Sequence, residues 1–364
     1  MLSVSVAMAT YNGSRFLRAQ LDSIAAQTRL PAELVVTDDA STDDTISIVR
    51  DFSRTSPFPV HVHRNAIRLG YRANFMRAVN LCTSDIVALC DQDDVWDREK
   101  IERATEPFAD PEVLLSCHEA WLSNALGERG ELARIFPLAE RSERLSLFPM
   151  INPYGFSMLF RRSLLRFSDL WNGSVDNLES DNRMAHDQWF FFLASVFGTI
   201  AYLDQPLADY RQHENSTYGV HQPARTLWNR AGRWVDVARR EYASFSVAAR
   251  ARAAILEEAV ARLDEPWCAR AVIAAGSYRE LARNCALRSA AYDLPSLSGR
   301  IRAWSGMAKV GAFEGARWSF GRNTAFKDAI CLLLPRRMIH ALPVPRRTKA
   351  NGQRDDAKRL PSCG

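Results

Sequence analysis

Short apolar runs rich in strand-forming residues alternate with helix-like segments through the first 110 residues, and this alternation constrains the fold more than any other feature. The strand-like runs are 3–9, 33–37, 59–63 and 85–90. Segments with apolar residues at helical spacing separate them, at 14–27, 46–52, 71–81 and 98–108. Regular alternation of this kind, with short connections, predicts an α/β fold: a mostly parallel central sheet flanked by helices.

The second half of the chain changes in character. Residues 186–197 are apolar on all sides, which predicts a helix buried against the sheet, and 199–203 reads as another strand. From about residue 216 the chain turns into long Ala/Arg-rich segments with no further strand pattern, such as 239–262 and 272–291. These segments predict a helical C-terminal appendage.

Three regions follow from this pattern. Residues 1–215 are expected to form the sheet domain, in two parts, 1–110 and 111–215. Residues 216–335 are expected to be helical, and 336–364 to be a basic, disordered tail.

The composition is that of a globular protein with its cysteines reduced. Of 364 residues, 47% are hydrophobic and 24% charged, enough to bury a full core. The seven cysteines are scattered without a CxxC pair, and the opening residues lack the pattern of a signal peptide. We therefore expect a cytoplasmic protein.

No apolar run reaches the roughly 18 to 20 residues of a spanning helix, so a membrane role would be peripheral.

The positive charge is concentrated at the C-terminus. The chain carries a formal charge of +5, and from residue 336 onward eight Lys and Arg face two Asp, so the tail nets +6 and the remainder about −1. Such a tail, following the apolar stretch 330–334, suits peripheral association with the inner face of the plasma membrane. The alternative is a solvated end without a partner. We expect no nucleic-acid partner.

Three polar clusters directly follow strands. The first run leads into Thr10, Tyr11 and Asn12, the second into Asp38 and Asp39, and the fourth into the acidic segment 91–94. Parallel strands would bring all three to one edge of the sheet, where ligands bind in open α/β folds.

The acidic segment predicts a divalent metal site. Asp91, Asp93 and Asp94 are hard oxygen ligands suited to Mg²⁺ or Mn²⁺, and such ions also take phosphate oxygens. No P-loop or GxGxxG phosphate cradle follows the first strand. The alternative for this segment is a helix cap before residue 98, and for Asp38 and Asp39 a turn between strand and helix.

Two further clusters lie in the second half. Asp187 stands at the start of the apolar helix beside aromatic residues, where it could remain ionised and serve as a general base. Further on, Arg211 could hold a phosphate and His213 could complete the metal shell. A helix cap for Asp187 and a structural role for His213 are the alternatives.

These motifs, taken together, resemble glycosyltransferase family 2 with the GT-A fold, specifically its rhamnosyltransferase-like branch of cell-surface polysaccharide synthesis. The resemblance covers about residues 3–217. Its carriers are the segments Val6-Ala7-Met8-Ala9-Thr10-Tyr11-Asn12-Gly13, Val36-Thr37-Asp38-Asp39-Ala40-Ser41-Thr42-Asp43 and Leu89-Cys90-Asp91-Gln92-Asp93-Asp94-Val95-Trp96, followed by His186-Asp187-Gln188-Trp189 and Tyr210-Arg211-Gln212-His213-Glu214-Asn215.

The resemblance implies a nucleotide-sugar and metal site in residues 1–110 and the acceptor and base side in 111–215, and it implies roles for individual residues. Asp91 and Asp93 would form the metal- and diphosphate-binding DxD motif, and Asp187 would be the catalytic base. The nucleotide-binding group would comprise Thr10, Tyr11, Asn12, Asp38, Asp39 and Asp91. The metal group would comprise Asp91, Asp93, Asp94 and His213, and substrate or phosphate contacts would come from Glu119, Trp189 and Arg211. The sequence departs from the family at His118-Glu119, where many relatives carry an Asp after the fifth strand.

The expected function is inverting, metal-dependent transfer of a sugar such as rhamnose from a nucleotide diphosphate donor to a glycan or lipid-linked acceptor. One alternative is a phosphohydrolase with an aspartyl nucleophile, because residues 91–95 also match its DxDx[TV] signature. That signature follows the first strand of its domain, whereas here it follows the fourth. A second alternative is a non-catalytic nucleotide-sugar-binding module.

Overall fold

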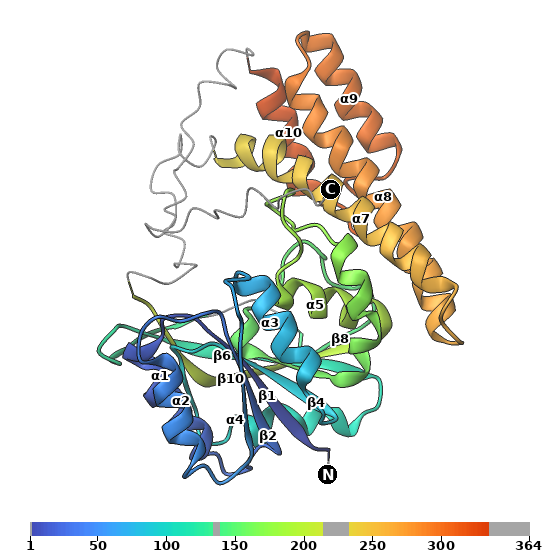
Figure 1. The fold of residues 1–364 in the computed structure, drawn as a ribbon. Helices are drawn as coiled ribbons and strands as arrows, with labels where there is room; N and C mark the ends of the chain where they lie inside the picture. The colour runs from blue at the N-terminus through green and yellow to red at the C-terminus, as the bar shows by residue number, and fades with distance from the viewer. Residues whose placement is uncertain (1, 134–138, 214–232, 335–364) are drawn as a thin grey trace, which may run out of the picture.

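A mixed ten-stranded sheet is the centre of the molecule (Figure 1). The structure is a computed structural model that describes residues 2–133, 139–213 and 233–334. Along the sheet the strand order is β3-β2-β1-β4-β9-β6-β10-β5, with β7 paired to β6 and β8 paired to β10. The strands are β1 (Val4–Thr10), β2 (Glu33–Asp38), β3 (Val60–Arg64), β4 (Ile86–Cys90), β5 (Val95–Trp96), β6 (Val113–Ser123), β7 (Arg129–Ala133), β8 (Arg141–Ser142), β9 (Met158–Arg161) and β10 (Thr199–Arg211).

The N-terminal half of the sheet is parallel, as the alternating pattern predicted. β3, β2, β1 and β4 run in the same direction, with Thr10 level with Asp38 and Met8 level with Cys90. The second half is mixed, because β9 pairs antiparallel with both β4 and β6, and β10 pairs parallel with β6. The parallel half therefore brings the ends of β1, β2 and β4 to a common edge.

Helices cover both faces of the sheet. The α-helices of this part are α1 (Ser14–Ala25), α2 (Thr45–Ser53), α3 (Tyr71–Leu81), α4 (Lys100–Thr105) and α5 (His186–Phe197), and short 3-10 segments are η1 (Glu106–Ala109), η2 (Gly155–Ser157) and η3 (Arg162–Gly173). One buried cluster joins α1, α2 and α4 to one face of the sheet, and a second joins α3 and α5 to the other. Successive residues of β1 alternate between the two clusters, Val6 and Met8 in one and Ala7 in the other.

The strands of the second half are longer than the sequence pattern predicted. β10 continues to Arg211 instead of ending near 203, and it accommodates Pro206 at a shift of register against β6. A sheet tolerates proline at a bulge, because the residue there need not donate a backbone hydrogen bond to the neighbouring strand, and proline has no N–H to donate. Residues 114–149 contain most of β6 together with β7 and β8.

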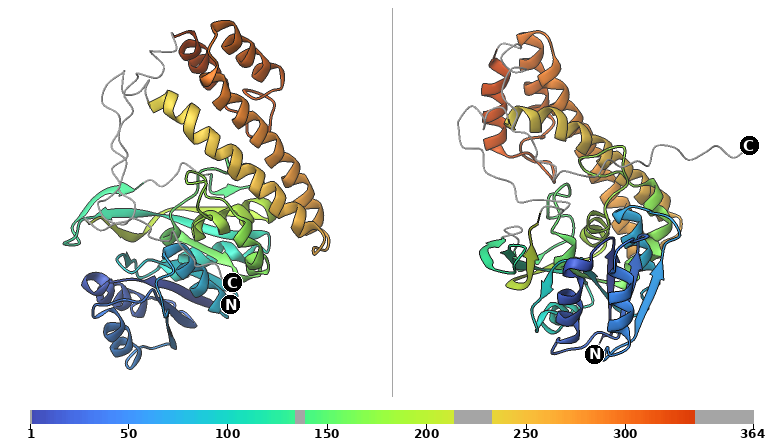
Figure 2. Two further views of the ribbon diagram at one scale, coloured as in Figure 1. Left: turned by 45° about the horizontal axis from the view of Figure 1, so that its top comes forward. Right: turned by 60° about the vertical axis from the view of Figure 1, so that its left-hand side comes forward.

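The C-terminal part is helical, as predicted, and no strand occurs between residues 233 and 334. It comprises η4 (Val237–Glu241, a π-helical turn), α7 (Tyr242–Val260), α8 (Trp267–Asp293), α9 (Leu297–Lys309) and α10 (Arg322–Leu333). The long helices α7 and α8 lie side by side (Figure 2). The expected boundary near 216 and the basic tail 336–364 fall outside the described residues.

The helical part and the sheet domain share one hydrophobic core. Phe245, Leu256 and Tyr278 from α7 and α8 belong to the same buried cluster as Trp189 and Phe192 of α5. Six cysteines fall in the described part of the chain, and all six are free thiols, five of them buried. No helix among the described residues is long and apolar enough to cross a bilayer.

Candidate active site

The predicted polar clusters meet at the carboxyl ends of β1, β2 and β4. The Thr10 hydroxyl donates to Asp38 Oδ2 at 3.0 Å, and the Asp39 backbone N–H donates to the Thr10 carbonyl at 2.8 Å. Gln92, after β4, holds the backbone of Tyr11 from both sides: its Oε1 accepts from the Tyr11 N–H at 2.9 Å and its Nε2 donates to the Tyr11 carbonyl at 3.1 Å. Three loops that are distant in the sequence thus form one edge.

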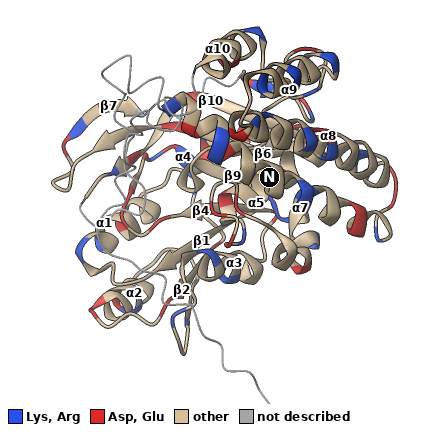
Figure 3. Cartoon of the chain, turned by 90° about the horizontal axis from the view of Figure 1, so that it is seen from above, with Lys and Arg blue, Asp and Glu red and all other residues tan. Residues whose placement is uncertain are grey.

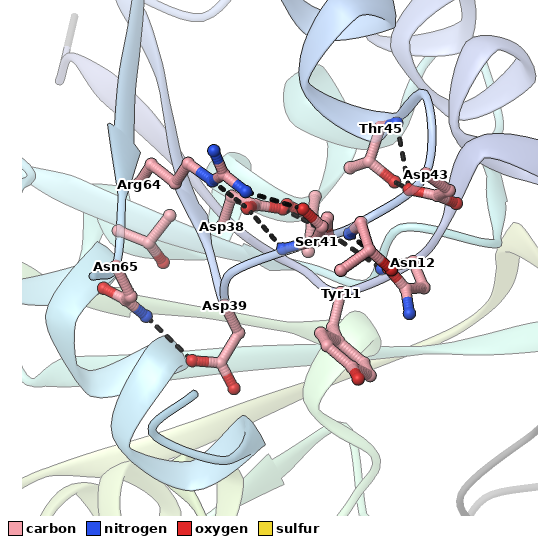
Figure 4. Close-up of polar contacts among 12 residues, drawn as sticks. Tyr11, Asn12, Asp38, Asp39, Ser41, Asp43, Thr45, Arg64 and Asn65 are labelled. Carbon is pink, nitrogen blue, oxygen red and sulfur yellow. Dashed lines mark hydrogen bonds and ion pairs between the residues drawn. The ribbon is translucent and has the colours of Figure 1, made fainter. Parts of the chain in front are cut away.

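Asp38 is used inside the protein to build the turn after β2 (Figure 4). Its side chain is fully buried, and its oxygens accept hydrogen bonds from the Ser41 backbone N–H at 2.9 Å and from the Ser41 hydroxyl. Arg64 approaches the same carboxylate at 3.8 Å. The geometry therefore favours the alternative that Asp38 stabilises the turn between β2 and α2. Its carboxylate supports the polar edge from inside and does not face a ligand.

Asp39 orders the loop that follows β3. Its carboxylate accepts hydrogen bonds from Asn65 Nδ2 at 2.9 Å and from the backbone N–H groups of Leu69 and Gly70 at 2.6 and 2.8 Å. A carboxylate has about four acceptor positions, so one remains for a ligand such as the N–H of a base. Gly70 adopts φ 83, a conformation that favours glycine, and this brings its N–H to the carboxylate.

Asn12 and Gly13 shape the turn after β1. Asn12 adopts φ 46, which asparagine tolerates better than most residues, and its Oδ1 accepts from the Thr42 N–H at 2.9 Å. At Gly13 an added Cβ would lie 2.2 Å from Gln92 Oε1. Glycine is therefore required for Gln92 to reach the Tyr11 backbone. The Tyr11 ring itself is half-buried, and the Arg68 guanidinium lies 4.1 Å from its centroid.

Asp91, Asp93 and His213 lie on the acidic side of this edge. Burial, followed by the charges of Asp93 and Asp187, raises the pKa of Asp91 to about 7. Asp93 Oδ2 lies 2.8 Å from His213 Nε2, and the imidazole ring packs 4.7 Å from Phe16. Two of the predicted metal ligands thus bind each other. No three His, Cys, Asp or Glu side chains in the described ranges converge on a preformed metal cage.

Asp94 lies beneath the edge. Its side chain is fully buried, and its Oδ1 accepts from the Arg211 backbone N–H at 3.1 Å. Burial, then Asp93 and Asp91, raises the pKa of Asp94. Lys100, also fully buried, donates to the Phe156 carbonyl at 2.7 Å, and its charge partly offsets those of Asp91 and Asp94. Asp94 thus connects β10 to the acidic loop and does not face the edge as a metal ligand would.

Two buried polar atoms beside the acidic loop bear on the kind of charge that this edge could hold. Asp94 Oδ2 and Arg211 Nε have no hydrogen-bond partner among the described residues. Such atoms are costly to leave unpaired. Crowded carboxylates beside an unpartnered guanidinium nitrogen fit a divalent cation with a diphosphate, because each ion compensates charges of the opposite sign.

Asp187 reaches the same region from the second half of the chain. It lies in the first turn of α5, where Asn152 Nδ2 donates to its Oδ2 at 3.0 Å. Burial, together with the nearby Asp176, raises the pKa of Asp187 to about 6 against the opposing effect of its hydrogen bonds. The charge of Asp187 is one of the causes that raise the pKa of Asp91. The geometry agrees, because a Cβ at Gly155 would lie 3.6 Å from Asp187 Cβ, and the next residue, Phe156, accepts at its carbonyl from Lys100 below the acidic loop.

Two predicted substrate contacts are displaced into the interior. Trp189 is fully buried in the core between α5 and α8, so it cannot touch a substrate in this structure. Glu119 lies within β6, because that strand continues to Ser123, and it accepts a hydrogen bond from the Tyr202 hydroxyl. Both corrections have the same cause, since residue order alone does not tell which face of an element is covered.

Several site residues were missed by the sequence analysis. Asn65 follows β3 and could have been found by the rule that identified the other clusters, since it too stands at the carboxyl end of a parallel strand. Asn152 and Asp176 lie in irregular segments and reach Asp187 or its neighbour Gln188 only through the fold. No local pattern distinguishes them.

The sequence profile described as "Glycosyl transferase family 2" matches residues 5–167, which include β1, β2, β4 and the acidic loop. Residues 5–167 are a glycosyltransferase domain of family 2. Its glycosyltransferase signature thus covers the edge where Thr10, Asp39 and Asp91 meet, and the family expected from the motifs is confirmed.

Relatives of this glycosyltransferase include a dTDP-rhamnosyl transferase of Shigella flexneri. That protein is 25% identical over 62% of this chain and 78% of its own length. An uncharacterized protein of Mycobacterium tuberculosis is 27% identical over 63% of this chain and 64% of its own. Among solved structures, residues 1–349 of TarS from S. aureus superpose with a TM-score of 0.51 at 18% identity, covering 91% of this chain and 90% of that one. This last likeness supports the fold, including its C-terminal helices.

Proposed function

We propose that this enzyme inverts the anomeric configuration as it transfers a sugar from a nucleotide diphosphate donor to a glycan or lipid-linked acceptor in cell-surface polysaccharide biosynthesis. The observation that carries the proposal is the polar edge where Gln92 of the acidic loop binds the backbone of Tyr11, inside the segment that matches the family profile. Asp187 lies close enough for its charge to act on Asp91 of that loop. A base on one side of the anomeric carbon and a diphosphate site on the other are what a single displacement needs. Rhamnose is the donor sugar to test first, because the Shigella relative is described as a dTDP-rhamnosyl transferase.

In this mechanism Asp187 takes the proton of an acceptor hydroxyl while that oxygen attacks the anomeric carbon. The bond from the anomeric carbon to the diphosphate breaks, and its electron pair leaves with the nucleoside diphosphate. Asn152, which donates to Asp187 Oδ2, orients the carboxylate toward the acceptor. General-base help of this kind is worth about 100- to 10,000-fold.

A divalent ion, Mn²⁺ or Mg²⁺, would be held by Asp91 and Asp93. Both are hard ligands at the edge, and His213 is already in contact with Asp93. Bound there, the cation supplies positive charge to the departing diphosphate. Arg211, with its unpartnered Nε, would hold a phosphate oxygen, while Tyr11 and the free acceptor position of Asp39 would bind the nucleoside.

The test is release of nucleoside diphosphate from a panel of nucleotide sugars, dTDP-rhamnose included, with Mn²⁺ or Mg²⁺ and with EDTA. We expect metal-dependent release from one donor, abolished in Asp93→Ala. Asp187→Asn should bind that donor normally but lose about 100-fold or more in transfer. The anomeric configuration of the product, read by NMR, checks inversion.

Retention of configuration, or normal transfer by Asp187→Asn, would remove the proposed mechanism. Hydrolysis of simple phosphate esters in place of any nucleotide sugar would support the aspartyl phosphohydrolase alternative, and binding without turnover would support a non-catalytic module.

For the location we propose the cytoplasmic side of the plasma membrane, with peripheral attachment through the C-terminal region. Phe326, Ile330 and Leu333 are spaced to share one face of α10, and each is at least 49% exposed. Lys and Arg positions occur on both α9 and α10 (Figure 3), and the sequence after α10 carries a net charge of +6. An apolar helix face beside basic residues suits an anionic membrane surface.

Vesicle co-sedimentation tests this attachment. We expect binding to vesicles containing anionic lipid, little binding to neutral ones, and loss of binding in Phe326→Glu. Ile273→Glu, at an equally exposed apolar residue of α8, is the matched control and should bind like the parent protein. Equal binding by both variants would refute the assignment to α10.

A further inference from the structure

Arg252 of α7 is a charged side chain buried without a charged partner. It is 1% exposed, and no carboxylate among the described residues lies within ion-pair distance of its guanidinium. Its hydrogen bonds go instead to neutral groups, Asn177 Oδ1 at 2.7 Å and Met150 Sδ at 2.8 Å. The rings of Phe192 and Tyr278 lie 5.4 and 5.7 Å from the guanidinium, and Asp176 acts on it only from beyond ion-pair distance. Because a buried charge with so little compensation is costly, stability alone does not account for an arginine at this position.

The two partners of Arg252 belong to the two loops that surround Asp187. Met150 lies two residues before Asn152, whose Nδ2 donates to Asp187 Oδ2. Asn177 is on the other loop, and its backbone N–H donates to Gln188 Oε1 at 3.3 Å, next to Asp187 in the chain. The loops also bind each other, since Asn177 Nδ2 donates to the Met150 carbonyl at 3.1 Å.

The loop that contains Asn177 also binds the amide nitrogen of the Gln188 side chain. Gln188 Nε2 donates to Asp176 Oδ2 at 3.0 Å, and Arg72 of α3 binds the same oxygen at 3.1 Å. Asp187 is therefore reached from Arg252 by two short routes, one through Met150 and Asn152 and one through Asn177 and Gln188. Both begin on a helix outside the segment matched by the family profile.

We propose that Arg252 is a positioning residue for the catalytic base: from the C-terminal helical part it fixes the two loops that orient Asp187. The inference rests on the proposed role of Asp187. It gives the helical part a function in the transfer reaction itself, since α7 would complete the base side of the active site. Arg252 would act through hydrogen bonds to neutral groups, and the carboxylate that acts on its charge is that of Asp176, beyond ion-pair distance.

The test is Arg252→Met, which keeps the volume and removes the donors. We expect kcat to fall about 10- to 100-fold, because small misplacement of a reacting group has an effect of this size, while donor KM stays within about twofold. The melting temperature should be unchanged or higher, since an apolar residue replaces a buried charge. Hydrogen exchange of backbone amides in 150–153 and 174–182 should become faster. Arg250→Met is the matched control, because Arg250 is exposed on the same helix and, within the described part of the chain, its side chain donates only to Ser246.

Asn177→Ala provides a second route if Arg252→Met does not fold, because it removes the acceptor on the loop and leaves α7 intact. It should lower kcat similarly, and the double variant should be no worse than either single one. Wild-type kcat and wild-type exchange in both variants, with Asp187→Asn inactive, would overturn the role of Arg252. Normal transfer by Asp187→Asn would instead remove the base assignment, whatever the loops do.

Discussion

At the scale of single residues, Asp187 and Asp39 illustrate two uses of a carboxylate in the site. Asp39 accepts three hydrogen bonds from protein donors. These occupy most of its acceptor positions and order the loop after β3. Asp187 accepts one from Asn152 and one from the Gln188 backbone N–H, at 3.0 and 2.8 Å. It therefore keeps acceptor positions for a substrate proton, and its basicity is raised by burial.

The pH dependence of transfer follows from the raised pKa of Asp187. The carboxyl group must be ionised to accept a proton, and burial with the nearby Asp176 raises its pKa to about 6. We expect kcat/KM to be level above that pH and to fall tenfold per pH unit below it, because the protonated form accumulates there. The residual activity of Asp187→Asn should lack this acidic limb. An acidic limb near pH 4 in the parent enzyme would contradict the raised value.

Gly13→Ala tests the contact between the loops after β1 and β4. The new Cβ would meet Gln92 Oε1, so either Gln92 or the turn must move. We expect a loss of about 1–3 kcal/mol in the free energy of unfolding, the usual range for overpacking, measured by urea denaturation. Gln92→Ala combined with Gly13→Ala should recover part of that loss. If the double variant were additive instead, the clash would not be with Gln92.

At the scale of elements, the C-terminal helices are joined by a buried ion pair between α8 and α10. Arg288 Nε donates to Asp328 Oδ2 at 2.8 Å, and both side chains are at most 1% exposed. The Tyr292 hydroxyl donates to Asp328 Oδ1 at 2.7 Å, and Trp234 Nε1 to the same oxygen at 3.2 Å. One carboxylate thus holds two helices and the segment before α7, where apolar contacts are fewer than in the sheet domain.

Asp328→Asn should lower the free energy of unfolding by about 3–5 kcal/mol, because Arg288 would remain buried without its counter-charge. Urea denaturation followed by tryptophan fluorescence measures the change. Asp293→Asn is the control, since its pair with Arg239 is half exposed and should contribute at most about 1 kcal/mol. Equal effects of the two substitutions would contradict the importance of burial.

At the scale of the whole molecule, the helical part is a component of the core. Phe245, Leu256 and Tyr278 pack in the same cluster as α5, which carries Asp187 at its first turn. Figure 1 shows α7 and α8 running from the far end of the molecule down to the layer of α5. The helices α7 and α8 therefore cover the outer side of α5 and η3, which in turn cover the sheet.

Truncation after residue 213 should consequently yield an aggregated or insoluble product, because the apolar face of α5 would be exposed to water. Truncation after residue 334 removes only the basic segment and should leave a soluble, active transferase. Size-exclusion chromatography and circular dichroism of the two products compare them. A monomeric, folded 1–213 fragment would show that the sheet domain is independent of α7 and α8.

Local pattern alone predicted the parallel half of the sheet and the residues at its edge. Strands such as β1 and β4 are short and apolar, and parallel strands must end together, so Thr10, Asp39 and Asp91 could be placed in one region without a structure. The helical character of 239–262 and 272–291 was equally local, because it depends on composition within each segment.

Only the tertiary structure decided which of these side chains face the site. Asp38 and Asp94 look like Asp39 and Asp91 in sequence, but burial and contacts with Ser41 and the Arg211 backbone turn them inward. The opposite holds for Asn152, which no motif marks and which the fold brings to Asp187. Sequence determines the chemistry available at the end of a strand, whereas the orientation of each group depends on packing between segments far apart in the chain, and no local pattern records that packing.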